Sequence, residues 1–481
     1  MSTTRPTTTD LAFAPALEQA RLIRGREVSP VELTQLFLDR IDRFDGPLNS
    51  YLTVADERAL DTARAAERRL DDPGLPAFHG VPISIKDLMA TAGIRTTYGI
   101  ESFRDHVPTQ DEHSVGRVRA AGFTILGKTN TPEKGTGCVT EPPAYGPARN
   151  PWETALTPGG SSGGAGAALA AGLCPIAHGS DGGGSIRVPS AWCGVVGVKP
   201  SRGRILASPT AISLHATVGP MARTVSDAAA LLDALTGPAL GPDLWGLAPE
   251  RSFLARTHEA PGRLRIAFSD GDQPLSPGYG GALARTAELL EELGHTVVEA
   301  DPGPRWPSAF FERVFTEAGV RRQSADLEAM TRADTRMRFL HPCSTGLLGH
   351  ADGLLAIDYL LEQQAMKADI ARWAAQGLAL FADHDVLLTP TVARRPLPVG
   401  LHEQLDPLEL WRTWYEAVPF TTMWNQTGQP AVSLPLHTDP DGLPIGMQLV
   451  GRPADEATLF RLAAQLEQAL PWHDRVPPGY A

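Results

Sequence analysis

The chain has 481 residues, of which 42% are hydrophobic and 20% charged, a composition typical of a globular protein and not of a disordered one. The net charge of -12 disfavours nucleic acid as a partner, because its phosphates would be repelled. The polar start Met1–Asp10 lacks the apolar core of a secretory signal, and no uninterrupted apolar stretch is long enough to span a bilayer. The four cysteines lack metal-site spacing. We therefore expect a cytoplasmic protein of bacterial type that contacts neither nucleic acid nor membrane.

Helices and short strands are predicted to alternate in the first third of the chain. Ser29 begins a capping box with Pro30 at the first helical position, and apolar residues follow at helical spacing. Alternating apolar residues over Gly80–Lys86 are typical of a short strand, with Lys86 at its end. Further elements are expected as helices over Glu57–Leu70, Val115–Ala121 and Ala165–Gly172, and as a strand over Phe123–Leu126.

The second half is also expected to mix helices and strands. Gly262–Ser269, Gly281–Leu293 and Thr296–Glu299 follow a strand, helix, strand order that predicts parallel pairing. The remaining expectations are a helix capped by Ser226 and Asp227 and running to about Leu235, mostly helical structure over 305–383, a buried strand over Val386–Pro390, a hairpin of Ala431–Pro435 with Gly446–Val450, and a helix over Glu456–Leu470. These patterns predict one large α/β domain with helical insertions.

Lysine is scarce in this chain. The 43 basic residues include only five lysines, namely Lys86, Lys128, Lys134, Lys199 and Lys367. Lysine can lose its proton and act as a base, whereas arginine effectively cannot. Codon drift accounts for most of such a bias, so the scarcity prompts a closer look at each lysine and assigns none of them a role.

Two clusters of glycine and serine carry the strongest chemical signal. They are Gly159–Gly164 and Gly179–Arg187, joined by a predicted helix of small residues. Consecutive glycines let backbone N–H groups approach a ligand, and such a nest beside a serine hydroxyl suits acyl transfer. A flexible linker would explain the first cluster alone, but it would not continue into the apolar run after the second. No Gly-Lys-Ser/Thr ending supports a phosphate-binding loop.

A competing interpretation concerns Ser161. Gly159–Gly163 satisfies the G-x-S-x-G pattern of a nucleophile elbow, which would pair Ser161 with a downstream aspartate and histidine. That elbow must follow a strand, whereas Trp152–Pro158 is predicted to be a loop. The downstream histidines also lie in no convincing motif, so each is expected to be a surface or packing residue.

Several segments together resemble the amidase signature family of serine hydrolases. They are Gly80–Asp87, Gly127–Glu133, Gly159–Arg204, Asn425–Ala431 and Leu443–Leu449. The resemblance is nearest to hydrolases of nylon-type cyclic oligoamides and to amidases that cleave aryl amides and urethanes. It implies an α/β amidase signature fold, with a large mixed, twisted sheet flanked by helices on both faces. The whole chain, 1–481, would form one domain, with the signature core at about 80–205 and a variable, helix-rich substrate region at about 240–420.

The resemblance also implies a site that needs no metal or other cofactor. Ser185 matches the family's nucleophile, Ser161 the bridging serine that follows a cis peptide bond, and Lys86 the base, whose pKa must be lowered by burial or by cationic neighbours. The remaining assignments are an oxyanion hole of Gly182, Gly183, Gly184 and Ser185, a loop-bracing pair of Asp181 and Arg187, and a substrate-binding loop of Gly135, Thr136, Gly137 and Cys138.

The expected activity is hydrolysis of C–N acyl bonds in small apolar or aryl amides, with carbamates and oligoamides as related substrates. The aromatic side chains between Trp411 and Trp424 fit either an apolar channel or plain core packing. Three alternatives stay open: a subunit of a glutamine-dependent amidotransferase complex, a non-catalytic binding protein, and an α/β-hydrolase esterase using Ser161. The assembly, including a homodimer, is left open.

Overall fold

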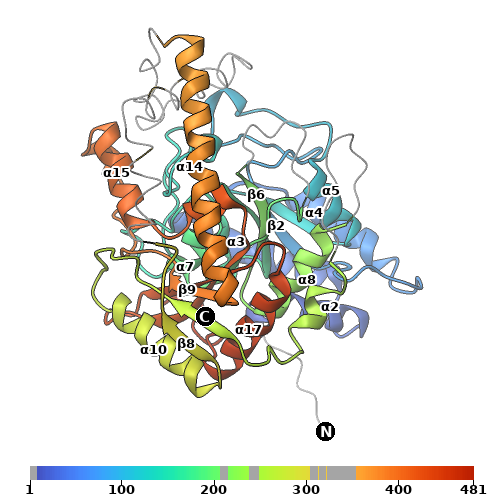
Figure 1. Cartoon of the computed structure of the whole chain (residues 1–481). Helices are drawn as coiled ribbons and strands as arrows, with labels where there is room; N and C mark the ends of the chain where they lie inside the picture. The colour runs from blue at the N-terminus through green and yellow to red at the C-terminus, as the bar shows by residue number, and fades with distance from the viewer. Residues whose placement is uncertain are drawn as a thin grey trace.

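The frame of the molecule is a continuous mixed β-sheet (Figure 1). The computed structural model describes residues 8–205, 215–237, 249–303, 313, 321, 325 and 354–481. Across the sheet, the 11 strands within these residues are β1 (Tyr51–Val54), β3 (Thr124–Thr129), β2 (Pro82–Lys86), β4 (Ile176–Asp181), β6 (Thr217–Ala222), β5 (Val196–Lys199), β10 (Ala431–Thr438), β11 (Pro444–Gly451), β9 (Val386–Pro390), β7 (Arg265–Phe268) and β8 (Thr296–Glu299).

The pairing of the strands is mixed. β2 runs parallel to β3 and β4, and β7 runs parallel to β8 and β9. The other neighbours are antiparallel, including the β10–β11 hairpin. β7 and β8 are the two strands of the predicted strand, helix, strand unit, and they pair in parallel as expected. The predicted hairpin is also confirmed, as β10 and β11.

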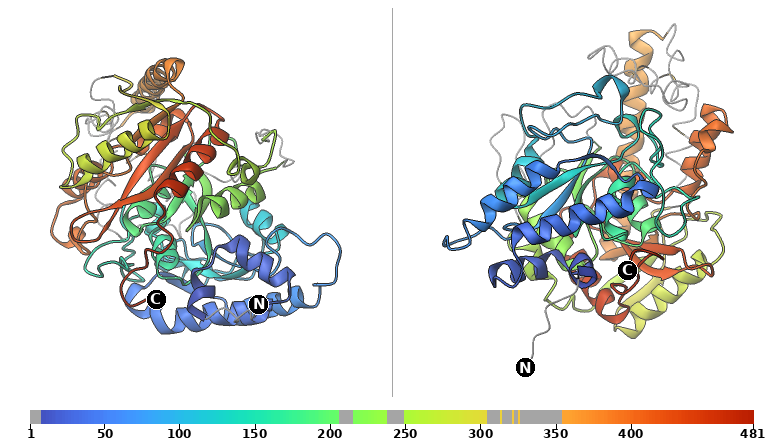
Figure 2. Two further views of the ribbon diagram at one scale, coloured as in Figure 1. Left: turned by 90° about the horizontal axis from the view of Figure 1, so that it is seen from below. Right: turned by 180° about the vertical axis from the view of Figure 1, so that it is seen from behind.

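Helices cover both faces of this sheet (Figure 2), as the family resemblance implied. The described α-helices are α1 (Thr8–Phe13), α2 (Ala16–Arg24), α3 (Pro30–Leu48), α4 (Asp56–Glu67), α5 (His113–Ala120), α6 (Gly163–Ala170), α7 (Arg187–Cys193), α8 (Val225–Leu235), α9 (Phe253–Arg256), α10 (Tyr279–Glu292), α14 (Ala356–Asp383), α15 (Pro407–Ala417), α16 (Thr422–Thr427) and α17 (Glu456–Ala469). Short 3₁₀ turns lie at Glu101–Phe103, Glu133–Gly135 and Leu401–Glu403.

Small residues bring α7 very close to the sheet. A Cβ at Gly197 would collide with the Ser190 side chain, and a Cβ at Gly446 would lie 2.5 Å from Cβ of Ala191. Because side chains alternate along a strand, Val196 and Val198 must point to the opposite face. There they are buried, and α8 packs on the same strand. Glycine on one face and valine on the other thus set the spacing of the two helical layers.

Helix starts follow the sequence signals in one case and depart from them in another. At α3 the capping box is confirmed, because the Ser29 side chain accepts from the N–H of Glu32 while the Glu32 carboxylate accepts from the N–H of Ser29. At α8 the expected caps were wrong. Thr224 is the cap and accepts from the N–H of Asp227, so Ser226 and Asp227 lie in the first turn.

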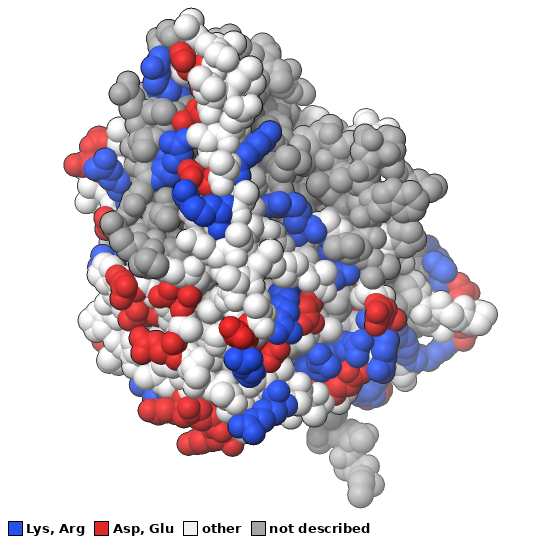
Figure 3. Space-filling model, viewed as in Figure 1, with Lys and Arg blue, Asp and Glu red and all other residues white. Residues whose placement is uncertain are grey.

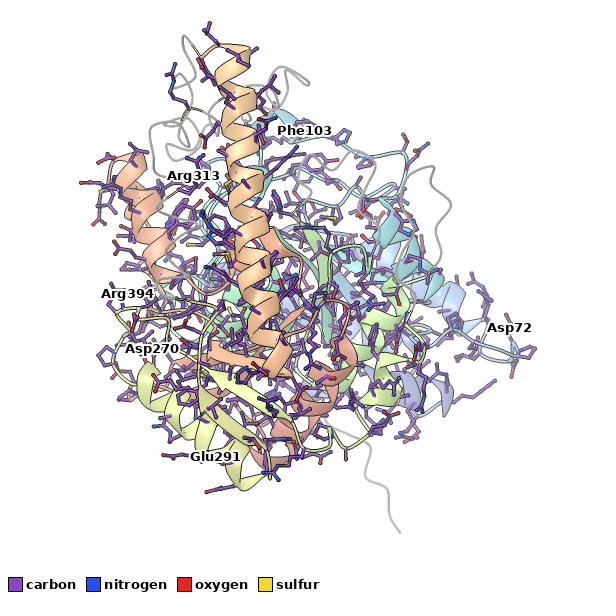
Figure 4. All side chains as sticks on the ribbon, in the orientation of Figure 1. Asp72, Phe103, Asp270, Glu291, Arg313 and Arg394 are labelled. Atoms are coloured by element: carbon purple, nitrogen blue, oxygen red, sulfur yellow. The ribbon has the colours of Figure 1, made fainter. Side chains whose placement is uncertain are left out.

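The prediction of helix over 305–383 is confirmed for α14, and most of the remainder lies outside the described residues. One end of α14 projects from the molecule in Figure 1. Arg313 lies against this helix (Figure 4), where its guanidinium pairs with Glu362 at 2.9 Å and Asp369 at 3.0 Å. On the face drawn in Figure 3, acidic and basic side chains are interspersed, and acidic ones gather over α10.

Candidate active site

The candidate site is built where β2 and β4 end side by side. Lys86 is the last residue of β2, and its side chain is fully buried. Its Nζ lies 2.7 Å from Oγ of Ser161, 3.0 Å from Oγ of Ser180 and 3.3 Å from the Ser180 carbonyl oxygen. The predicted contact between Lys86 and the first Gly/Ser cluster is therefore present in the structure.

Burial gives Lys86 the acid–base property that a catalytic base needs. Loss of solvation lowers the pKa of its ammonium to about 7, and the negative charge of Asp181 opposes this shift only in part. About half of such amines are neutral at pH 7, compared with fewer than about one in a thousand for an ordinary lysine of pKa ~10.4. A neutral amine 2.7 Å from a hydroxyl can accept its proton.

Ser161 lies in the first Gly/Ser cluster, just before α6. The Gly160–Ser161 peptide bond is cis, as the family resemblance implied. Gly160 has no room for a side chain, since a Cβ there would lie 2.5 Å from the carbonyl oxygen of Val139. The next residue joins the two clusters, because the N–H of Ser162 donates to the carbonyl oxygen of Ser185 at 3.0 Å.

Ser185 lies in the turn between β4 and α7 and is half-buried. Its hydroxyl makes no hydrogen bond within the described ranges, so it is available for reaction. Within the described residues, no hydrogen bond joins Ser161 directly to Ser185. Catalytic hydrogen bonds are commonly longer before substrate binds and tighten in the complex.

The oxyanion-hole prediction requires one correction, at Gly184. Its N–H donates to Oδ1 of Asp181 at 2.7 Å, so it is not free for a substrate oxygen. The N–H groups of Gly182, Gly183 and Ser185 make no hydrogen bond to the part of the chain that the structure describes. The sequence could not separate these four donors, because the separation depends on which of them the Asp181 carboxylate reaches.

The expected brace of Asp181 and Arg187 is a buried network. The guanidinium of Arg187 is fully buried and donates to both carboxylate oxygens of Asp181, at 2.9 and 3.0 Å. It also donates to Thr421 O, Gln448 Oε1 and Asn425 Oδ1 at 2.6–2.9 Å. Burial acts to raise the pKa of the Asp181 carboxyl, but Arg187, together with the charge of Lys199 and a hydrogen bond from Asn425, holds it well below its usual range. The loop of Gly182–Ser185 is thereby tied to α16 and β11.

The four residues of the expected substrate-binding loop play different parts. Gly135 borders the site, since a Cβ there would lie 3.3 Å from Oγ of Ser161 and 2.6 Å from Leu88. Gly137 instead packs against the ring of Trp414. Thr136 turns back to donate to the carbonyl oxygen of Glu133, and Cys138 is buried with its Sγ 3.9 Å from the carbonyl oxygen of Trp414.

The aromatic side chains of 411–424 mostly form core. Trp414, Phe420 and Trp424 are buried, whereas Trp411 and Tyr415 are only partly covered. Core packing is therefore the better interpretation for three of the five. Trp414 still bears on the site, because it packs against the loop that carries Gly135.

Among the described residues, the other lysines of the signature core make no hydrogen bond to Ser161 or Ser185. Lys128 pairs with the buried carboxylate of Asp87 at 3.4 Å, and burial lowers its pKa to about 8. Lys199 is also buried and its pKa falls to about 7, but its Nζ donates to the carbonyl oxygen of Pro200. Lys134 lies 4.8 Å above the ring of Tyr98. A low pKa therefore does not by itself single out Lys86; its contact with Ser161 does.

The elbow interpretation of Ser161 is wrong. The segment before Gly159 forms turns and loop with no strand. No histidine of the described chain hydrogen-bonds to Ser161 or Ser185, although His341 and His350 lie outside that part. His295 and His437, for example, hydrogen-bond to Gln465 and Thr286 far along the chain from either serine.

The described residues contain no group of three His, Cys, Asp or Glu side chains that could hold a metal ion. Within them, no helix is long and apolar enough to cross a membrane.

Sequence reasoning missed three hydroxyl groups at this site, those of Ser180, Thr421 and Thr422. Ser180 contacts Lys86, and both threonines donate to the carbonyl oxygen of Gly183. The sequence could have identified Ser180 as a site residue, because it directly precedes Asp181 in the second Gly/Ser cluster. The threonines had no such signal, because they lie some 240 residues downstream and meet the loop only in the folded chain.

Comparison with known proteins gives a consistent result. The sequence profile described as Amidase matches residues 32–460. A putative amidase, AmiB2 of Mycobacterium tuberculosis, is 41% identical over 489 residues, covering 98% of this chain and 99% of the relative. The 6-aminohexanoate-cyclic-dimer hydrolase of Paenarthrobacter ureafaciens is 35% identical over 488 residues, covering 96% of each chain.

Solved structures show the same likeness. The structure of 6-aminohexanoate cyclic dimer hydrolase complexed with substrate superimposes with a TM-score of 0.85 at 32% identity, covering 97% of this chain and 99% of that one. A bacterial aryl acylamidase of the amidase signature family superimposes with a TM-score of 0.84 at 26% identity, with the same coverage.

Proposed function

Because the chain belongs to the amidase family and is an enzyme that hydrolyses C–N acyl bonds, we propose that Ser185, Ser161 and Lys86 are its nucleophile, proton relay and base. One observation carries this assignment. The Nζ of Lys86, whose pKa burial lowers to about 7, lies 2.7 Å from Oγ of Ser161. A base with this pKa works near neutral pH, where an ordinary lysine would stay protonated.

The acylation step uses all three side chains. Neutral Lys86 accepts the Ser161 hydroxyl proton while Ser161 accepts the proton of Ser185. The Ser185 Oγ then bonds to the substrate carbonyl carbon, and the carbonyl electron pair moves onto oxygen. When the C–N bond breaks, the leaving nitrogen takes a proton from Ser161, which regains one from Lys86. This last transfer matters because an unprotonated amide nitrogen leaves poorly.

The acyl-enzyme is released by the reverse route. Water attacks the ester carbon and passes its proton through Ser161 to Lys86. The Ser185–carbon bond then breaks as Ser185 recovers its proton. In both steps the negative oxygen is stabilised by N–H groups, for which Gly182, Gly183 and Ser185 are the available donors.

We infer that the substrates are small apolar or aryl amides, and that the same substrate class includes oligoamides and carbamates. Leu88 packs where a side chain at Gly135 would stand, and Trp414 backs the same loop, so apolar groups border this side of Ser161. The relatives named for 6-aminohexanoate cyclic dimer and for aryl acylamides support this class. We expect the enzyme to act on small molecules in the cytoplasm, without a partner protein of another kind, and within the single domain 1–481.

A fluorophosphonate probe tests the catalytic assignment. We expect the purified chain to be labelled on Ser185, as located by peptide mass spectrometry, and to hydrolyse p-nitroacetanilide without any partner chain. Lys86→Met should abolish both labelling and turnover. Lys199→Met is the matched control, because Lys199 is equally buried with a similar pKa but does not contact Ser161.

The other outcomes distinguish the alternatives. Label on Ser161, or full activity of Ser185→Ala, would overturn the assignment of the nucleophile. Turnover only in the presence of partner subunits would indicate an amidotransferase component. A substrate panel of an anilide, an N-phenyl carbamate, 6-aminohexanoate cyclic dimer and a free amino-acid amide tests the substrate class, which fails if only the amino-acid amide is hydrolysed.

A further inference from the structure

The oxyanion loop presents a physical problem that its own sequence does not solve. Gly182, Gly183 and Gly184 are consecutive glycines, the residues with the most backbone freedom. Donors that stabilise an oxyanion must already be oriented before the reaction to be effective. Something outside the loop must therefore hold its peptide planes in place.

One peptide unit of this loop is held at both ends. The Gly183 carbonyl oxygen accepts from Oγ1 of Thr421 at 2.7 Å and from Oγ1 of Thr422 at 2.9 Å. The N–H on the other side of the same peptide, that of Gly184, donates to the Asp181 carboxylate at 2.7 Å. A carbonyl oxygen has two lone pairs, so two hydroxyl donors can satisfy both and fix its direction. The single proton of the Thr421 hydroxyl has a second acceptor, the carbonyl oxygen of Val418, but that oxygen lies farther away, at 3.3 Å.

The two threonines are themselves held firmly. Thr421 is fully buried and Thr422 is 6% exposed. The carbonyl oxygen of Thr421 accepts from the guanidinium of Arg187 at 2.9 Å, and Arg187 is paired with Asp181. The contacts therefore form a closed ring from the Gly183 carbonyl through Thr421, Arg187 and Asp181 back to the Gly184 N–H.

Close packing at Gly184 shows that this arrangement is specific. The backbone there has φ +131°, a region that residues with side chains rarely adopt, and a Cβ would collide with Oγ1 of Thr421. Glycine at this position therefore lets the threonine hydroxyl approach the loop, and the hydroxyl in turn restrains the glycine.

We propose that Thr421 and Thr422 are positioning residues for catalysis. Their hydroxyls lock the Gly183–Gly184 peptide and so set the directions of the flanking N–H groups of Gly183 and Ser185, which bind the oxyanion. This inference rests on the proposed function, because it assumes that Ser185 is the nucleophile. Within the described residues neither threonine hydroxyl hydrogen-bonds to Ser185, Ser161 or Lys86, so we assign both an action through the loop.

Removal of the hydroxyls with little change in volume tests this role. We expect Thr421→Val and Thr422→Val each to lower kcat about 10-fold with KM changed less than about twofold, since loss of a direct oxyanion donor costs about 10²–10³-fold and a positioning group costs less. Affinity for a phenyl trifluoromethyl ketone, which forms a charged tetrahedral adduct with a serine, should fall by the same factor. Thr421→Ser and Thr422→Ser keep the hydroxyl and should stay within about twofold of the parent.

Thr427→Val is the matched control. Thr427 belongs to the same helix, α16, and its hydroxyl donates to the carbonyl oxygen of Met423, away from the oxyanion loop. We expect its kcat and inhibitor affinity to match the parent protein. Equal losses in Thr427→Val would indicate a general disturbance of α16 and would overturn the proposal.

Two further results would also overturn it: parental kcat and inhibitor affinity in the Thr421→Val/Thr422→Val double variant, or serine variants as impaired as the valine variants. If the double variant does not fold, the single variants decide by the same criteria. Failure of the proposed function looks different, because the unsubstituted enzyme itself would then lack fluorophosphonate label on Ser185.

Discussion

The pKa of Lys86 leads to a quantitative prediction about the pH dependence of the reaction. Burial lowers this pKa to about 7, and only the neutral amine can accept the Ser161 proton. The neutral fraction is then about 0.09 at pH 6, about 0.5 at pH 7 and about 0.9 at pH 8. We therefore expect kcat/KM to rise about tenfold from pH 6 to pH 8 and then to level off.

The plateau distinguishes this base from an ordinary lysine. With a pKa of ~10.4, the neutral fraction would continue to rise about tenfold for each pH unit up to pH 9 and beyond. The assay is p-nitroacetanilide hydrolysis at substrate concentrations well below KM, from pH 5.5 to 9.5, since kcat/KM reports groups of the free enzyme.

Lys199 provides the internal control for this experiment, because its pKa is also lowered to about 7 and yet it contacts neither serine. The inflection near pH 7 should persist in Lys199→Met. A flat profile between pH 6 and 8, or a rate that keeps rising tenfold per unit through pH 9, would refute the reasoning. Loss of the inflection near pH 7 in the Lys199→Met variant would also refute it.

Three other substitutions have defined expectations. Arg187→Met should lower the free energy of unfolding by about 3–5 kcal/mol in urea titration, because it leaves the Asp181 carboxylate buried without its partner; a loss below about 1 kcal/mol would show that the network is redundant. Glu467→Gln should flatten the pH dependence of stability. Burial raises the pKa of Glu467 to about 7, so the folded state holds its proton more tightly than the unfolded state and the parent loses about 3 kcal/mol between pH 4.5 and 7; equal slopes in parent and variant would contradict this. Gly135→Val should reduce turnover of every amide tested, since φ is +77° and a side chain would crowd Leu88 and Ser161; an unchanged kcat/KM for the anilide would place the substrate elsewhere.

Much of the local structure could be predicted because it depends on nearby residues. The Ser29–Glu32 capping box is complete within four residues, and the α3 helix begins where the box predicts. Lys86 could be assigned to a strand end because alternation over five residues reports a strand. The two Gly/Ser clusters likewise predicted backbone N–H donors beside a serine, because the glycine content of a segment is visible in that segment alone.

The family resemblance added what spacing could not. It placed Lys86 beside Ser161 across 75 residues of sequence, and the structure shows the contact at 2.7 Å. It also implied the cis bond before Ser161, which no local propensity predicts. The Lys86–Ser161 contact and the cis peptide bond both depend on many residues acting together. They could therefore be predicted only from a sequence pattern shared with other proteins.

Only the tertiary structure decided which groups of the site are free and which are engaged. Gly182, Gly183 and Gly184 are equivalent in sequence, yet the Asp181 carboxylate engages the N–H of Gly184. The low pKa of Lys86 arises from burial by surrounding segments, and desolvation cannot be read from neighbours in the chain. The hydroxyls of Thr421 and Thr422 reach the oxyanion loop from some 240 residues away. The sequence therefore determined the chemical groups of this enzyme, whereas folding determined their protonation and their partners, because both depend on what lies within a few ångströms in space.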